Sequence, residues 1–298
     1  MTDLQQFGGE VPIPNNKASS LFHFIKEQLS PIYTISETTT LAYTLFEWAC
    51  HINRSSYHAH PEQLVNTSAI LQLNHAIQAL LNQKPIQYIT GFTDFFHHRF
   101  HVTPDTLIPR PETEELVDFI IKHYKKTSPI ILDLGTGSGC IAISLALSIP
   151  NAKVWAIDLS EKAIEVAQYN NQTLNASVNF IQADMTQSYW IDKIGKVDCL
   201  ISNPPYIPIK EKETLALQVR ENEPHMALFV KDNDPLFFYR HIVEIGKKIL
   251  NFEGIVCVET HDLYNEDVFN LFVLYGYANI RLIKDLSGKN RFVYAEKP

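Results

Sequence analysis

The residues of this chain that bear most directly on chemistry are Asn203-Pro204-Pro205-Tyr206. They directly follow the apolar run of residues 197–202, which is typical of a buried parallel strand. The tetrapeptide is therefore expected at the carboxyl end of a strand, where open α/β sheets bind their ligands.

The two prolines determine what this tetrapeptide can do, because they fix two φ angles and remove two backbone donors. What remains is a rigid rim of acceptors: the side-chain oxygen of Asn203 and the carbonyl oxygens of Asn203 and Pro204. Such a rim suits a planar amino group, which offers two N–H donors, and Tyr206 would cover the flat face of that group. On this motif alone, a rigid loop without a chemical role is the alternative interpretation.

A glycine-rich turn upstream indicates a second ligand site. Residues 130–134 are predicted to form a strand, and a helix is predicted from about Cys140. The glycines between them allow a tight turn whose backbone approaches a ligand closely. The residues of this turn that we expect to contact the ligand are Gly135, Thr136, Gly137, Ser138 and Gly139.

Acidic residues at the ends of the neighbouring predicted strands narrow the type of ligand. Asp158 follows the apolar run 153–157 and lies 19 residues after Gly139. This is close to the offset of about 20 residues expected for a carboxylate that binds ribose hydroxyls. A dinucleotide site would have a third glycine where Cys140 stands. The pattern therefore favours a nucleoside ligand without a pyrophosphate, such as S-adenosylmethionine.

The remaining side chains at these strand ends can be placed around such a ligand. Asp133 would face its positively charged amino or sulfonium end. Asp184, after the predicted strand 178–182, would accept a hydrogen bond from the adenine amino group, and Met185 would lie against the adenine ring. Filling of the hydrophobic core is the alternative interpretation of Met185.

The order of these motifs resembles the class I S-adenosylmethionine methyltransferases that modify planar amino groups. These include adenine-N6 and cytosine-N4 DNA methyltransferases and protein glutamine methyltransferases. From about residue 20 to the C-terminus, the chain resembles one family in particular, the peptide chain release factor N5-glutamine methyltransferases (PrmC/HemK). The segments that resemble it, in the family's order, are 85–91, 106–117, 203–208, 220–228 and 285–295.

The resemblance implies an α/β fold, the Rossmann-like class I methyltransferase fold. This fold has a mostly parallel seven-stranded sheet that ends in an antiparallel hairpin, here with a small N-terminal helical bundle. The implied reaction transfers a methyl group from S-adenosyl-L-methionine to the side-chain amide N5 of the glutamine in the Gly-Gly-Gln motif of bacterial class 1 release factors. It leaves S-adenosyl-L-homocysteine and needs no metal.

The resemblance also implies roles for particular residues. Asn203, Pro204, Pro205 and Tyr206 would be catalytic, and Asn203 would contact the donor as well. The loop that holds Arg110 would roof the donor site.

The chain is expected to have three parts. Residues 1–84 form a helical domain that recognises the substrate, with residues 1–18 as a loose arm and Ser36 as the N-terminal cap of a helix. Residues 85–108 form a β-hairpin that links the domains, and residues 109–298 form the catalytic domain.

The composition constrains the substrate and the compartment. The 298 residues include 25 basic and 33 acidic ones, with a net charge of −8, whereas enzymes that hold duplex nucleic acid present basic surfaces. A protein substrate fits better, and no direct nucleic-acid binding is expected. The sequence has no membrane-length apolar stretch, no signal-peptide pattern and no Cys-x-x-Cys pair. We therefore expect a reduced, cytoplasmic protein without a membrane contact. A monomer is also expected, although the composition does not derive it.

Two other function classes stay open at this point. A nucleic-acid amino methyltransferase of the adenine-N6 type shares the Asn-Pro-Pro-Tyr chemistry, and its transfer to DNA or RNA would fall steeply with salt. A donor-binding protein without catalysis would bind S-adenosylmethionine and no acceptor. Residues 229–235 and 258–262 depart from the family pattern, and neither segment contributes a predicted donor or acceptor residue.

Overall fold

The structure, a computed structural model, describes residues 15–124 and 128–298. The chain consists of two compact units, Met1–Thr90 and Gly91–Pro298. The first unit has one hydrophobic core, and the second has a core on each face of a central sheet. The three-part division predicted from the sequence, with a linker at 85–108, stays a prediction.

The first unit is a bundle of helices, which confirms the small N-terminal bundle expected from the sequence. Its helices are α1 (Ala18–Leu29), α2 (Ile35–Cys50), α3 (Arg54–Ala59), α4 (Thr67–Leu81) and α5 (Ile86–Thr90). Apolar residues at helical spacing meet in its core, where Leu21, Phe46 and Ile77 are at most 2% exposed. The unit therefore folds around its own buried apolar surface.

Helix α2 begins at a different residue from the predicted one. Its cap is Thr34, whose hydroxyl accepts a hydrogen bond from the Glu37 amide (3.3 Å) while the Glu37 carboxylate accepts one from the Thr34 amide (2.8 Å). In such a capping box the acidic residue comes three positions after the cap. The prediction that Ser36 is the cap is wrong, because Glu37 follows Ser36 directly and pairs with Thr34 instead.

The structure also differs from the prediction at both ends of this unit. Residues 1–14 of the predicted loose arm lie outside the described residues. Lys17, however, pairs with Leu64 in an antiparallel bridge and its ammonium binds Glu62 at 2.6 Å, so residues 15–18 belong to the unit. Residues 86–90, predicted as part of a β-hairpin, form α5, because Tyr88 is buried and the helix packs on α2 and α4.

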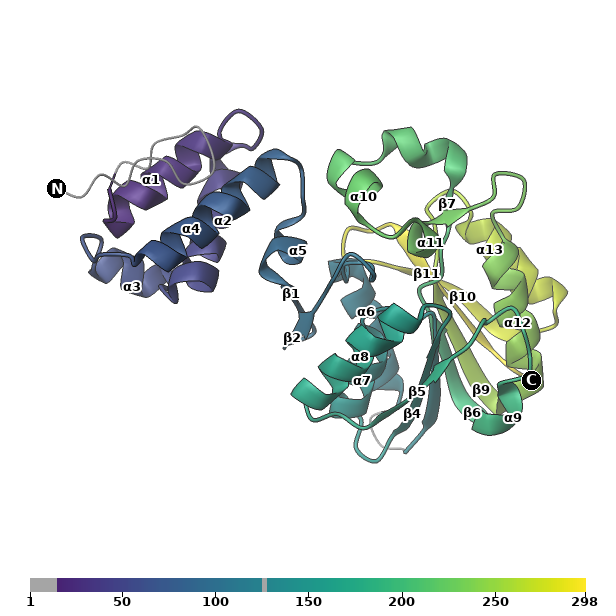
Figure 1. Cartoon of the computed structure of the whole chain (residues 1–298). Coiled ribbons are helices and arrows are strands. Elements are labelled where there is room, and N and C mark those ends of the chain that lie inside the picture. The colour runs from purple at the N-terminus through teal and green to yellow at the C-terminus, as the bar shows by residue number, and fades with distance from the viewer. Residues whose placement is uncertain (1–14, 125–127) are drawn as a thin grey trace. The chain divides into compact units, whose positions relative to one another are not determined.

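The second unit is built on a seven-stranded sheet. Its strands are β3 (Ile130–Leu134), β4 (Lys153–Asp158), β5 (Val178–Gln182), β6 (Val197–Ser202), β9 (Leu250–Glu259), β10 (Ala278–Lys284) and β11 (Asn290–Glu296). The strand order is β10-β11-β9-β6-β3-β4-β5, and β11 is antiparallel to both of its neighbours while the other pairs are parallel (Figure 1). This confirms the class I methyltransferase sheet with its antiparallel C-terminal hairpin.

Among the described residues, two short pairs of strands lie outside this sheet. The predicted hairpin is present as β1 (Phe92–Phe95) and β2 (His98–His101), which pair antiparallel. Further along, β7 (Ile207–Pro208) directly follows the Asn-Pro-Pro-Tyr motif and pairs in parallel with β8 (Phe229–Val230). This second pair anchors both ends of the segment that follows the motif.

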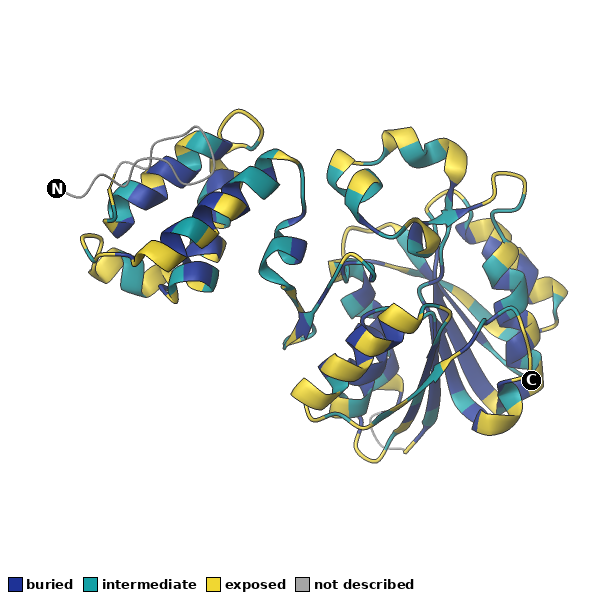
Figure 2. Cartoon of the chain, viewed as in Figure 1, coloured by how far each residue is buried: buried dark blue, intermediate teal, exposed yellow. Residues whose placement is uncertain are grey.

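Helices cover both faces of the sheet (Figure 1). On one face lie α6 (Pro111–His123), α7 (Cys140–Ser148) and α8 (Glu161–Thr173), and on the other lie α9 (Ile191–Ile194), α12 (Phe237–Ile249) and α13 (Asn265–Leu274). Between β7 and β8 run the short helices η1 (Ile209–Thr214), α10 (Leu217–Asn222) and α11 (His225–Leu228). The central strands are buried on both faces, as Figure 2 shows.

The register of the parallel strands aligns their carboxyl ends. Leu134 of β3 pairs with Ser202 of β6, and Ser202 pairs with Val258 of β9. The next residue of each strand segment, among them Asn203 and Glu259, therefore lies at the same edge. The chain runs from β3 to β4 on one side and later returns to β6 on the other, so this edge is the switch point where doubly wound sheets bind ligands.

Thr34→Ala is expected to destabilise the protein by about 1 kcal/mol, because it removes the hydroxyl that satisfies an amide at the start of α2. Ser36→Ala is the matched control, since Ser36 is exposed within the first turn and should change the free energy of unfolding by less than about 0.5 kcal/mol. Urea unfolding of the full chain, followed by circular dichroism, measures both. Equal losses for the two variants would contradict the cap at Thr34.

Candidate active site

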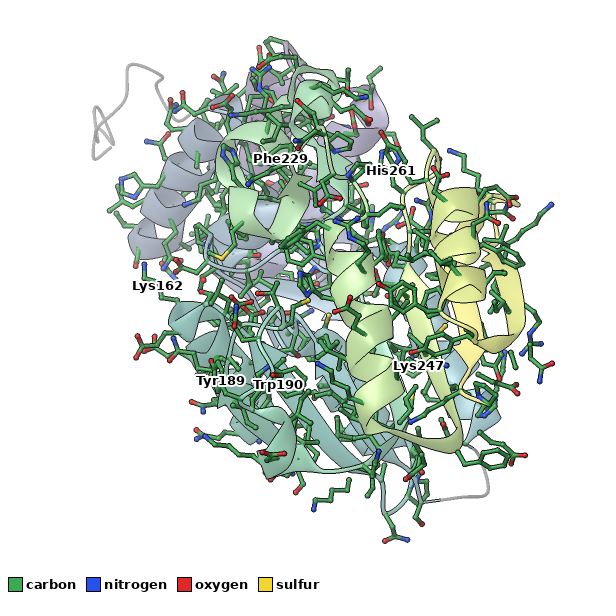
Figure 3. The ribbon with its side chains drawn as sticks, turned by 90° about the vertical axis from the view of Figure 1, so that its right-hand side faces the viewer. Lys162, Tyr189, Trp190, Phe229, Lys247 and His261 are labelled. Atoms are coloured by element: carbon green, nitrogen blue, oxygen red, sulfur yellow. The ribbon has the colours of Figure 1, made fainter. Side chains whose placement is uncertain are left out.

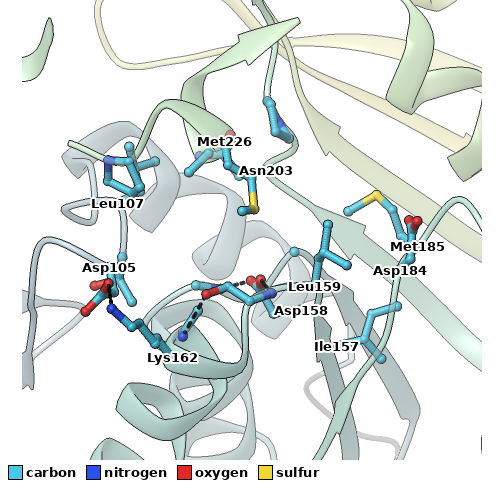
Figure 4. A pocket seen from close by; sticks show the side chains of 18 of the residues that line it. Asp105, Leu107, Ile157, Asp158, Leu159, Lys162, Asp184, Met185, Asn203 and Met226 are labelled. Atoms are coloured by element: carbon cyan, nitrogen blue, oxygen red, sulfur yellow. Dashed lines mark hydrogen bonds and ion pairs between the residues drawn. The ribbon is translucent and has the colours of Figure 1, made fainter.

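A pocket of about 380 Å³ opens at the carboxyl edge of the sheet (Figure 4). Its volume lies within the range of about 300–1,000 Å³ that is usual for small-molecule sites. The residues predicted from the sequence that line it are Gly135, Gly137, Asp158, Asp184, Met185, Asn203 and Pro205. The structure thus brings the ends of β3, β4, β5 and β6 together around one cavity.

The glycine-rich turn after β3 needs its glycines for backbone geometry. Gly135, Gly137 and Gly139 have φ angles of 77°, 55° and 81°, a region that disfavours residues with a Cβ atom. A Cβ atom on Gly139 would also lie 2.9 Å from Ile143 and 3.1 Å from Ala167, so this glycine lets α7 pack closely. Thr136 and Ser138 of the turn are buried and do not line the pocket.

Asp158 joins the glycine turn to the start of α8. Its Oδ2 accepts a hydrogen bond from the Gly137 amide (2.8 Å), and its Oδ1 accepts one from the Ser160 amide (2.9 Å). Burial raises the pKa of Asp158, and the amides of Ser160 and Gly137 oppose that rise. Each carboxylate oxygen can accept a further hydrogen bond, so Asp158 can bind hydroxyl groups of a ligand in the pocket.

Asp184 and Met185 form the wall that follows β5. The Oδ1 of Asp184 accepts from the Thr186 amide (2.8 Å) and hydroxyl (2.7 Å), so its Oδ2 is left to a ligand donor. The fully buried Trp190, labelled in Figure 3, packs in the core beside the sheet. It donates to the Asp184 carbonyl at 3.0 Å, which holds this loop against the sheet. Met185 both lines the pocket and belongs to the hydrophobic core, so its two interpretations are compatible.

Asp133 lies fully buried beside the pocket and is not one of its lining residues. Its Oδ2 accepts from the Thr136 hydroxyl at 2.7 Å, whereas its Oδ1 has no hydrogen-bond partner among residues 15–124 and 128–298. Burial raises the pKa of Asp133 to about 7, and the nearby charge of Asp158 adds to this rise. The predicted contact of Asp133 with the cationic end of a ligand stays a prediction.

The Asn-Pro-Pro-Tyr motif presents its asparagine to the pocket in a fixed orientation. The Nδ2 of Asn203 donates to the Thr113 hydroxyl at 3.2 Å, which leaves Oδ1 as an acceptor. Pro204 is buried, Pro205 lines the pocket, and the hydroxyl of Tyr206 donates to Glu259 Oε1 at 3.1 Å. Burial raises the pKa of Tyr206, so this hydroxyl stays a donor.

Arg110 does not line the pocket, but it ties two of its walls together. Its Nη2 lies 2.7 and 2.8 Å from the two carboxylate oxygens of Glu223, which also accept a 3.3 Å hydrogen bond from the Ile108 amide. One wall, residues 104–107, precedes Arg110, and the other begins at Pro224 directly after Glu223. A direct contact of Arg110 with the donor stays a prediction.

Sequence reasoning missed several residues of this site. Lys162 of α8 and Asp105 both line the pocket and form an ion pair at 3.1 Å at one end of it (Figure 4). No pattern in the sequence brings these segments together. Glu259 did carry a signal, because it is an acidic residue at the end of an apolar run, like Asp158.

Comparison with known proteins decides the family. Residues 20–91 match the PrmC N-terminal domain, and residues 113–223 match the methyltransferase small domain. A release factor glutamine methyltransferase of Flavobacterium psychrophilum is 40% identical over 90% of this chain and 94% of its own length. The chain belongs to the release factor glutamine methyltransferase family.

A second relative in this family also matches this chain over nearly its whole length. The release factor glutamine methyltransferase of Bacteroides thetaiotaomicron is 37% identical over 92% of this chain and 98% of its own length.

Among solved structures, the hMettl16 catalytic domain in complex with an RNA hairpin has a TM-score of 0.52. It is 13% identical and the match covers 76% of this chain and 80% of that one, so it supports the fold alone.

Within residues 15–124 and 128–298, no helix is long and apolar enough to cross a membrane. In the same part of the chain, no group of three or more His, Cys, Asp or Glu side chains is placed to hold a metal ion.

Asp133→Asn is expected to stabilise the protein increasingly as the pH rises from about 4 to about 7, and by a constant amount above that. The folded-state pKa of Asp133 is about 7, above its ordinary value, so the folded protein binds a proton that the unfolded chain has released. Wild-type stability is therefore lost as pH rises towards 7, by up to about 4 kcal/mol, and the variant lacks this loss. Unfolding by urea across this pH range measures the difference. A difference that does not change between about pH 4 and about pH 7 would contradict a raised pKa at Asp133.

Proposed function

We propose that this protein transfers the methyl group of S-adenosyl-L-methionine to the side-chain amide nitrogen of the glutamine in the Gly-Gly-Gln motif of bacterial class 1 release factors. The observation that carries the proposal is that Asn203 and Pro205 line the same pocket as Asp158 and Asp184. Residues proposed to bind the donor and residues proposed to bind the acceptor thus line one cavity, in a chain from a family named for this activity.

The free acceptor atoms of the pocket support S-adenosylmethionine as the donor. Asp158 can bind the ribose hydroxyls, and the Oδ2 of Asp184 can accept from the adenine amino group while Met185 packs on the ring. Asp133 does not line the pocket, but its buried Oδ1, which has no hydrogen-bond partner among residues 15–124 and 128–298, is proposed to meet the cationic amino acid end. When bound, S-adenosylmethionine supplies an electrophilic methyl group on a sulfonium.

The acceptor rim has to align a weak nucleophile, because the lone pair of a glutamine amide is delocalised into its carbonyl. The Oδ1 of Asn203 and the carbonyl of Pro204 would accept the two amide N–H bonds and aim the nitrogen lone pair at the methyl group. Tyr206 would pack on the face of the amide. Alignment of this kind can lower a barrier by about 7–11 kcal/mol, and hydrogen bonds that strengthen in the transition state add to it.

A dedicated base is not required in this scheme. The amide nitrogen becomes acidic as it is methylated, so its proton can leave late. Burial raises the pKa of Tyr206, so its hydroxyl keeps its proton, and that hydroxyl donates to Glu259. Tyr206 is therefore suited to packing and not to proton removal.

The helical unit is proposed to recognise the release factor. It matches the PrmC N-terminal domain over residues 20–91 and has its own core. The catalytic unit is large enough to fold without it. The release factor and the enzyme are both proposed to work in the cytoplasm.

The proposal is tested by transfer of labelled methyl from S-adenosylmethionine to a purified class 1 release factor. We expect label on the unmodified factor and none on a factor whose Gly-Gly-Gln glutamine is changed to alanine. Duplex DNA and single-stranded RNA are offered in parallel. Label on a nucleic acid and not on the factor would assign the protein to the nucleic-acid amino methyltransferases.

Two substitutions separate the acceptor set from the donor set. Asn203→Ala is expected to lower methyl transfer more than tenfold with donor affinity changed less than about twofold, because it removes one hydrogen bond to the amide. Asp158→Ala is expected mainly to weaken donor binding, by about tenfold or more. Calorimetric titration with S-adenosylhomocysteine gives the donor affinity, and steady-state transfer gives the rate. Equal losses of both quantities in Asn203→Ala would contradict its assignment to the acceptor.

A further inference from the structure

A buried hydrogen-bond network connects the acceptor rim to two residues outside the motif. Asn203 Nδ2 donates to the Thr113 hydroxyl at 3.2 Å, and that hydroxyl donates to Glu259 Oε2 at 2.7 Å. The other carboxylate oxygen of Glu259 accepts from the Tyr206 hydroxyl at 3.1 Å. Thr113 and Glu259 are each 2% exposed, so water does not compete for these bonds.

The donors and acceptors of this network are determined by the Glu259 carboxylate, which accepts from both hydroxyls. In its ionised form, which the Thr113 and Tyr206 hydroxyls and the charge of Arg291 favour against burial, the Glu259 carboxylate accepts hydrogen bonds and donates none. The single hydroxyl proton of Thr113 then points to Glu259. The Thr113 oxygen then faces Asn203 with lone pairs alone. Asn203 must meet it with its NH2 group, and its Oδ1 must turn the other way.

Three elements from distant parts of the sequence hold this arrangement. Thr113 lies in the first turn of α6, Asn203 follows β6, and Glu259 ends β9, whose register places it beside the residue after Ser202. The hydroxyl of Tyr239, on α12, donates to the Glu259 carbonyl at 2.9 Å. The positive charge of Arg291 opposes the rise in the pKa of Glu259 that burial causes.

We propose that Thr113 and Glu259 are positioning residues that set which atom of the Asn203 amide faces the acceptor. The inference rests on the proposed function and deepens it. A fixed Oδ1 accepts a group that donates, such as the NH2 of a glutamine amide, and repels a carboxylate. Without the network, the Asn203 amide can rotate by 180° and present its NH2 group, which cannot bind an amide N–H.

Thr113 offers a matched pair of substitutions. Thr113→Val keeps the shape of the side chain and removes the hydroxyl, whereas Thr113→Ser keeps the hydroxyl and removes a methyl group. A packing role is retained by valine, and a hydrogen-bonding role is retained by serine. We expect Thr113→Val to lower kcat for methyl transfer about tenfold, and Thr113→Ser to stay within about threefold of wild type.

The lower kcat of Thr113→Val should result from a change in the orientation of Asn203, and the donor site should stay intact. In Thr113→Val, the affinity for S-adenosylhomocysteine is expected to stay within twofold of wild type. In an Asn203→Ala background, the same substitution is expected to change the residual transfer less than twofold, since its effect is already lost. Thermal unfolding of each variant, read by circular dichroism, shows whether the fold is kept.

Three outcomes would overturn the inference. One is wild-type transfer by Thr113→Val, and another is an equal loss in the valine and serine variants. The third is a tenfold loss that recurs in the Asn203→Ala background, which would show that Thr113 acts independently of Asn203. In each of these outcomes the wild-type control still methylates the release factor, so the proposed function is not contradicted. Absence of wild-type transfer would instead overturn the proposed function and the inference together.

Discussion

The in-register parallel pairing of β4, β3, β6 and β9 is the constraint on which the rest of this structure depends. Parallel ladders align the carboxyl ends of neighbouring strands, and here they bring Asp158, Gly135, Asn203 and Glu259 to one edge. These residues are separated by up to 124 positions of the 298-residue chain. A slip of one residue in the β6 ladder would turn Asn203 away from the pocket, because successive side chains of a strand point to opposite faces.

This edge concentrates carboxylates where water is scarce. Burial raises the pKa of Asp133, Asp158 and Glu259, which means that each destabilises the folded protein in its charged form. Nearby donors offset part of that cost: amides for Asp158, and the hydroxyls of Thr113 and Tyr206 for Glu259. The remaining acceptor capacity is what a cationic or hydroxyl-bearing ligand can use, so the site is costly to stability and useful for binding.

The sequence predicted the strands around the pocket well and its walls poorly. The bounds expected for β3 and β6 agree with the structure, because each apolar run ends in a glycine or in Asn203, residues that strands disfavour. The wall formed by residues 104–107 and the Arg110–Glu223 pair arise from tertiary contacts between loops, which no local pattern reveals. Likewise, α5 is helical because it packs on the bundle, although its residues favour strands.

Glu259 shows why a motif can indicate chemistry without containing all of its determinants. Asn-Pro-Pro-Tyr supplies acceptor atoms, but an asparagine amide presents an oxygen or an NH2 group with almost the same shape. Its own four residues cannot choose between them. Here the choice follows from the carboxylate of Glu259, 56 residues after Asn203, and the hydroxyl of Thr113, 90 residues before it. Hydrogen bonds join the three side chains. The polarity of the acceptor rim is therefore a property of the fold, and the register of β9 against β6 enforces it.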